Sequence, residues 1–148
     1  MSQTESQDYF NLHITGIGYL NRARAVCPNR GTSFLAVDIA ALHGATNAVE
    51  YTRFDCRVSG KEAQRVVQIL MPHIELGQKV LVGFKLGDLY ADTFVYEKGE
   101  RTGTTGVSLK ARLLRIAWAK VDSKTVYTAT WRAEESGERR VNTEPEPA

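Results

Sequence analysis

Apolar and polar residues alternate along the first part of the chain, which is the pattern of a half-buried β-strand. The alternation is clearest from Phe10 to Ile14 and predicts a strand over residues 9–26. Gly16 and Gly18 interrupt it, and glycines inside a strand usually mark a bulge or a sharp bend. The first strand is therefore expected to curve.

Two more strands are predicted after the turn CPNRGT, namely SFLAVDIAAL and AVEYTRFDCRV, with the loop HGATN between them. Successive residues of a strand point to opposite faces of the sheet. The expected core faces carry Leu35, Val37, Ile39, Phe54, Cys56 and Val58. The expected outer faces carry Phe34, Ala36, Asp38, Tyr51, Arg53, Asp55 and Arg57.

A helix is predicted directly after the third strand. The sequence from Ser59 to Glu62 fits an S-x-x-E capping box, in which the hydroxyl and the carboxylate satisfy two free amides. An apolar stripe follows at helical spacing: Ala63, Val66, Val67, Ile69 and Leu70. Pro72 is expected to end or bend this helix, and Gly77 to open the next loop.

Strand patterns return after the helix. KVLVGFKL predicts a fourth strand that continues past Gly87 as LYADTFVYEKG, and the polar residues 97–106 predict a mobile hairpin loop. VSLKARLLRIAWAKV begins as a fifth strand, although its part ARLLRIAWAKV suits a helix as well as a strand. The inward positions of this strand are Leu109, Ala111 and Leu113, and the outward positions are Lys110 and Arg112. TVYTATWRA is compatible with one more strand.

The predicted order of elements is strand, strand, strand, helix, strand, strand, with an extra C-terminal element. This order excludes a doubly wound βαβ sheet. It matches an all-β protein with one helix, the OB-fold, which is a five-stranded Greek-key barrel whose helix lies between strands three and four. The length of 148 residues suits one domain, predicted over residues 9–132, between a disordered N-terminus (1–8) and a polar acidic tail (133–148).

The net charge of +2 is unevenly distributed. Residues 1–10 and 141–148 carry four acidic and no basic side chains, which leaves 19 basic against 13 acidic residues between them. Two segments, 11–37 and 101–120, contain basic residues and no acidic ones. A positive body with acidic ends suits a polyanionic partner, although a solvated surface of average charge fits as well.

The motifs of the common enzyme classes are missing, so no enzyme, cofactor or metal site is predicted. The three histidines lie in separate elements without metal-ligand spacing: His13, His43 and His73. Gly16-Ile17-Gly18 lacks the third glycine of a dinucleotide site. Cys27 and Cys56 are read as reduced thiols of a cytoplasmic protein. No secretory signal and no apolar run long enough for a membrane span occur in the chain.

A binder of single-stranded nucleic acid needs aromatic rings for stacking and cations that follow the phosphates. The outer face of the third strand offers Tyr51, Arg53 and Arg57, and the second strand adds Phe34. In an OB barrel the same cleft is bordered by Arg22, Arg24, Lys110 and Arg112, and the hairpin loop with Lys98 and Arg101 overhangs it. Packing at a subunit interface is the alternative for the two rings, and a solvated hairpin is the alternative for the loop. Asp38 and Asp55 are expected to pair with Arg53 and Arg57 and to weaken the positive field.

The segments FNLHITGIGYLNRARAV, FLAVDIAAL, EYTRFDCRVSGKEAQRV and LGQKVLVGFKL together resemble bacterial single-stranded DNA-binding proteins. The whole chain more closely resembles a family with an uncharacterised domain, carried by integrative and conjugative elements and described as element replication proteins. Ordinary single-strand binders stack bases on tryptophans, whereas this chain has none before Trp118. It offers instead Phe34, Tyr51, Tyr90, Phe94 and Tyr96. Its end, NTEPEPA, lacks the hydrophobic tip through which ordinary members recruit other proteins.

The resemblance implies a sequence-tolerant single-stranded DNA-binding protein that supports replication or maintenance of a mobile element. It also implies a homo-oligomer, either a dimer or a tetramer. The competing hypothesis is an OB-fold adaptor that binds replication or conjugation proteins through the same face or through the segment from Trp118 to Trp131. An RNA-binding protein is a third possibility, since OB-folds accept both nucleic acids.

Overall fold

The structure is a computed structural model that describes residues 10–129. Six strands and one helix follow one another in the order β1 (His13–Val26), β2 (Phe34–Ala45), β3 (Ala48–Val58), α1 (Lys61–Glu75), β4 (Val80–Val95), β5 (Thr105–Val121) and β6 (Lys124–Thr128). The predicted order is confirmed, including the extra C-terminal strand. The predicted disordered N-terminus and acidic tail lie outside the described residues.

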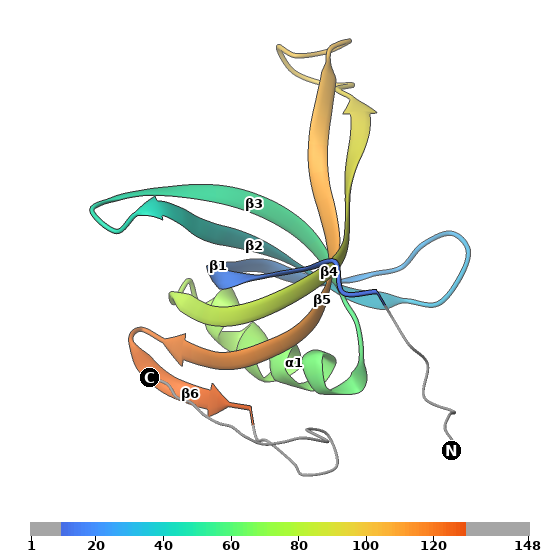
Figure 1. Ribbon diagram of the computed structural model, residues 1–148. Helices are drawn as coiled ribbons and strands as arrows, with labels where there is room; N and C mark the ends of the chain where they lie inside the picture. Colours follow the sequence, from blue (N-terminus) through green and yellow to red (C-terminus); the bar gives the residue numbers. More distant parts are fainter. Residues whose placement is uncertain (1–9, 130–148) are drawn as a thin grey trace.

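The strands form one sheet in the order β3-β2-β1-β4-β5-β6, which closes because β3 also pairs with β5. The closing pair is parallel and joins Asp55–Val58 to Lys110–Leu113. α1 contacts β1, β3, β4 and β5 beneath the barrel, and β6 extends the sheet beyond β5 (Figure 1). A closed five-stranded barrel with its helix between strands three and four has the predicted OB-like fold.

β1 belongs to both halves of the barrel. Its residues His13–Tyr19 pair with β4, and Gly18–Val26 pair with β2. A side chain at Gly18 would place its Cβ 2.7 Å from the carbonyl oxygen of Ala40, so only glycine allows this approach. Gly16 and Gly18 were expected to mark the bulge of β1, but the register shift lies between Asn21 and Arg24.

The core contains most of the side chains predicted to point inward. The inward face of β3 is buried as expected, and β2 contributes Val37 and Ile39, while Leu35 is only half-buried. From α1 the core receives Ala63, Val66, Val67 and Leu70. Ile69 was wrongly assigned to this stripe, since its side chain is 46% exposed. It lies about 100° from Leu70 around the helix, which takes it past the edge of the buried face.

The predicted start of α1 and the predicted end of β2 are wrong. The N-cap of α1 is Gly60 and no side chain caps it, because Glu62 instead accepts hydrogen bonds from Arg65 and Tyr127. The predicted capping box therefore does not form. β2 extends to Ala45 instead of ending at Leu42 and leaves only a two-residue turn before β3, because His43, Gly44 and Ala45 all pair with β3. β3 has its predicted bounds.

The start of β1 also differs from the prediction, whereas α1 and β5 each exclude one of the alternatives that the sequence left open. Phe10 is 99% exposed and precedes β1, which begins only at His13. Pro72 does not end α1, which continues to Glu75. β5 extends unbroken from Thr105 to Val121, which decides between strand and helix for this segment.

Candidate nucleic-acid interface

The outer face of β1, β2 and β3, with the adjoining parts of β4 and β5, carries most of the predicted binding residues. Strand register places Arg53 beside Ala40, Arg57 beside Arg112, and Tyr90 beside Lys110. We call this surface the first face. Two hairpins stand out from the barrel beside it (Figure 1). One is the β2–β3 hairpin, and the other is the long β4–β5 hairpin of residues 88–110, which we call the arm.

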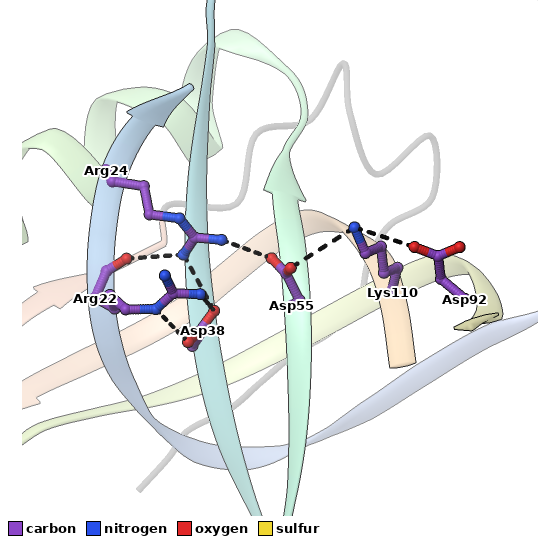
Figure 2. A network of polar contacts seen from close by, with 6 residues as sticks. All are labelled: Arg22, Arg24, Asp38, Asp55, Asp92 and Lys110. Carbon is purple, nitrogen blue, oxygen red and sulfur yellow. Dashed lines mark hydrogen bonds and ion pairs between the residues drawn. The ribbon is translucent and has the colours of Figure 1, made fainter. Parts of the chain in front are cut away.

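Asp38 lies at the centre of the first face and is only 2% exposed. Its carboxylate accepts a hydrogen bond from Arg22 Nε at 2.9 Å and one from Arg24 Nη1 at 3.1 Å. This contact raises the pKa of the Arg22 guanidinium. Arg24 donates through its other terminal nitrogen to Asp55 at 2.9 Å, so one guanidinium joins two carboxylates (Figure 2).

The contacts continue across the closing edge of the barrel. Lys110 Nζ lies 4.0 Å from Asp55 Oδ2 and 3.4 Å from Asp92 Oδ2. We call this set the charge network (Figure 2): Arg22, Arg24, Asp38, Asp55, Lys110 and Asp92. It contains three cations and three carboxylates and is therefore formally neutral. A further predicted cation, Arg112, is paired with Asp88 at 3.2 Å.

Asp38 and Asp55 form ion pairs as expected, but their partners differ from the predicted ones. Asp38 and Asp55 bind the arginines of β1 and Lys110, not Arg53 and Arg57. Arg53 has no ion pair with any residue of the described chain, and Arg57 lies over a ring instead. The positive field of the first face therefore comes mainly from β3.

A β-bulge brings the β1 arginines into the network. Leu20 points inward, so simple alternation would also turn Arg22 and Arg24 into the barrel. The register shift between Asn21 and Arg24 inserts one extra residue, and Arg22 adopts a left-handed backbone with φ of 51°. Both arginines therefore reach Asp38 on the outside.

Aromatic rings lie at both ends of the first face. Tyr51 is 58% exposed, and its ring centroid is 6.5 Å from that of Tyr19. At the other end the guanidinium of Arg57 lies 4.2 Å from the ring centroid of Phe34. Tyr19 was not among the predicted residues. The alternation of β1 was a sufficient signal, because Tyr19 lies between the inward positions 18 and 20.

The arm carries the remaining predicted residues. Tyr90 lies near its base beside Lys110, whereas Tyr96, Lys98 and Arg101 lie at its tip, away from the barrel (Figure 1). The Arg101 side chain donates a hydrogen bond to the Tyr96 hydroxyl at 3.0 Å. The tip folds onto itself, with two threonine hydroxyls donating to backbone carbonyls within the loop. The arm tip is thus not brought together with the rest of the site.

A protein-family model matches residues 3–135, which is most of the chain. The chain belongs to the DUF3577 family. This family is described as a protein of unknown function, and the match does not link the chain to integrative and conjugative elements or to single-strand binders. No curated protein and no solved structure was found to match the chain. The helix of this DUF3577 protein that the structure describes is too short to cross a membrane.

The inner side of the first face in the DUF3577 protein holds a protected thiol. Burial, followed by the carboxylates of Asp55 and Asp38, raises the pKa of Cys56 to about 12 from an ordinary value of 9.0. The stabilising effect of the protonated thiol is fully present below pH 9 and is lost as the pH rises toward 12. The loss amounts to about 1.4 kcal/mol per pH unit in that window.

We therefore expect the free energy of unfolding of the wild type to fall more steeply above pH 9 than that of Cys56→Ala. Urea titrations between pH 8 and pH 10.5 measure this difference. Cys27→Ala is the matched control and keeps the wild-type slope, because Cys27 is exposed. Equal slopes for the two variants would contradict the shifted pKa. A thiol reagent at pH 8 should likewise modify Cys27 quickly and Cys56 only on unfolding.

Proposed function

We propose that the chain binds single-stranded DNA through the first face, with little sequence preference, and supports replication or maintenance of an integrative and conjugative element. The observation that carries the proposal is the exposed ring of Tyr51, which lies 6.5 Å from the half-buried ring of Tyr19 and beside Arg53, which has no ion pair with any described residue. The outer face of strands two and three is the surface with which OB-folds bind oligonucleotides. The resemblance of the sequence to single-strand binders and to element replication proteins supports the biological setting.

Stacking is expected to outweigh the contacts that the rings already make. A base stacked on an aromatic side chain contributes about 1–3 kcal/mol. The cation that covers the Phe34 ring contributes roughly 0.5–1 kcal/mol at an exposed site. A base can therefore displace Arg57 from this ring at a net gain, and the freed guanidinium then lies close to the neighbouring phosphate.

The neutral charge network limits how strongly salt affects binding. Only the two arginines of β3 are clearly available for phosphates on this face, since the others neutralise carboxylates. Each neutralised phosphate of a single strand contributes a slope of about −0.7 to the dependence of log K on log salt. Two phosphates give a slope of about −1.4, which is shallow for a nucleic-acid-binding protein.

A fluorescence anisotropy titration with labelled oligo-dT at two salt concentrations tests the proposal. We expect binding at low salt and a slope of about −1 to −2. Competition between poly-dT and poly-U then separates DNA from RNA as the ligand, since only RNA carries the 2′-hydroxyl. An absence of binding to any oligonucleotide in dilute buffer would contradict the proposal.

The exposed apolar side chains of the arm favour binding to another protein chain. It exposes the apolar side chains of Leu89, Val95 and Val107, and a two-stranded ribbon is only marginally stable by itself. We propose that the arm packs in a cytoplasmic homo-oligomer, a dimer or a tetramer. If the protein is a monomer by light scattering, does not bind oligo-dT and captures a replication or conjugation protein, the adaptor function is favoured instead.

A further inference from the structure

A second outer face lies on the other side of β1. Strand register forms three rows across β1, β4 and β5: Thr15–Lys85–Arg115, Ile17–Gly83–Trp118 and Tyr19–Leu81–Lys120. The neighbouring positions of these strands point into the core, among them Val82, Phe84, Ile116 and Ala119. We call the three rows the second face.

The second face carries basic side chains and no acidic one at its nine positions, all of which the structure describes. It differs in this from the first face, where carboxylates neutralise most cations. Lys85 and Lys120 have no ion pair with any residue of the described chain. A polyanion complements such a surface. A second copy of the chain does not, because a two-fold interface pairs a surface with itself and brings like charges together.

The indole of Trp118 lies against the second face because Gly83 has no side chain. A side chain at Gly83 would place its Cβ 2.5 Å from Trp118 Nε1, so the indole lies directly over the backbone of β4. Lys120 Nζ lies 5.6 Å from the centroid of the same ring. Beside the indole is a hollow of about 310 Å³, lined by apolar groups including Ile17 and by Lys85. This volume is at the lower end of the range of small-ligand sites.

We propose that the second face is a second track for single-stranded DNA, on which a base enters the hollow beside Trp118 while Lys85 and Lys120 contact phosphates. The inference rests on the proposed function of the first face. Tyr19 joins the two surfaces, because it pairs with Ala40 of β2 on one side and with Leu81 of β4 on the other. A strand that leaves the first face at Tyr19 therefore reaches the second face without leaving the protein.

The fluorescence of Trp118 is the direct measure of this track. Trp131→Phe leaves Trp118 as the single tryptophan of the chain. One OB-fold covers roughly 4–16 nucleotides, so an oligo-dT of about 8 fits the first face and one of about 30 extends beyond it. We expect the long oligonucleotide to quench Trp118 strongly and the short one to bind with little quenching.

Substitutions that remove positive charge distinguish binding at the second face from binding at the first face. We expect Lys85→Ala/Lys120→Ala to weaken binding of the long oligonucleotide about 3- to 10-fold and to leave the short one within twofold. Lys61→Ala/Arg65→Ala removes the same charge from exposed positions of α1 and should change neither affinity.

Gly83→Ala provides an independent test of the position of Trp118. The added methyl group displaces the indole, so this variant should lose the quenching while the short oligonucleotide still binds.

The outcomes distinguish the two proposals. If both oligonucleotides bind while Trp118 is not quenched and the lysine variant is normal, the second track is wrong and the first face stands. If neither oligonucleotide binds, both proposals fail. If Ile17→Glu converts an oligomer into monomers by light scattering and the long oligonucleotide does not quench Trp118, the second face is an interface between copies, which overturns the inference.

Discussion

Tyr51→Ala is expected to bind oligo-dT about 5- to 150-fold more weakly than the wild type, because it removes one stacking platform worth roughly 1–3 kcal/mol. Tyr51 is more than half exposed and contacts another ring only at 6.5 Å, so the substitution should change stability by no more than about 0.5 kcal/mol. Anisotropy titrations with oligo-dT, together with urea unfolding of the same variants, measure both quantities.

Two further variants sharpen this prediction. Tyr51→Phe keeps the ring and should bind within about twofold of the wild type, which separates stacking from the hydroxyl group. Arg53→Ala should make the salt slope shallower by about 0.7, whereas Lys61→Ala on α1 should leave it unchanged. Equal affinities of the wild type and Tyr51→Ala for every oligonucleotide length would show that the first face does not stack bases.

The strands without irregularities were the most predictable from the sequence. β3 has the predicted ends, and its residues alternate as expected, because no bulge interrupts it in its pairing with β2. β5 was ambiguous for a physical reason. The register shifts in its pairing with β4 make its buried positions recur at intervals of two and three residues: Ala111, Leu113, Ile116, Ala119 and Val121. This spacing imitates that of an amphipathic helix, and only the pairing with β4 distinguishes the two.

The sequence was sufficient to predict which side chains share the outer face of the barrel, but not which of them contact one another. Alternation alone indicated that Tyr51, Arg53 and Arg57 share the outer side of β3. The partners of Asp38 and Asp55 depend on the bulge at Arg22, a residue in a left-handed conformation that a non-glycine side chain rarely adopts. No local signal in the sequence marks that position. The second face was missed because its residues come from three strands that only the barrel brings side by side.

Asp38→Asn should make the protein less stable and at the same time a stronger binder of nucleic acid. The substitution keeps the shape of the side chain but removes the charge that holds Arg22 and Arg24. Hydrogen bonds to charged groups contribute about 1.5–3 kcal/mol, and the penalty for an unpaired buried arginine is reduced here because Arg22 is largely exposed. We expect a loss of about 2 kcal/mol in the free energy of unfolding and a fall in Tm on the order of 5–8 °C.

The same substitution frees at least one guanidinium for phosphate. We expect tighter binding of oligo-dT at low salt and a salt slope steeper by about 0.7 for each cation released. Asp92→Asn is the matched control, because it makes the same change of charge at a half-exposed position whose carboxylate has Lys110 as its one ion-pair partner among the described residues. It should steepen the slope similarly with a loss of stability below about 1 kcal/mol. If Asp38→Asn instead lost affinity in proportion to its loss of stability while Asp92→Asn bound normally, the network would serve to hold the first face in shape, and its neutralising effect on binding would be refuted.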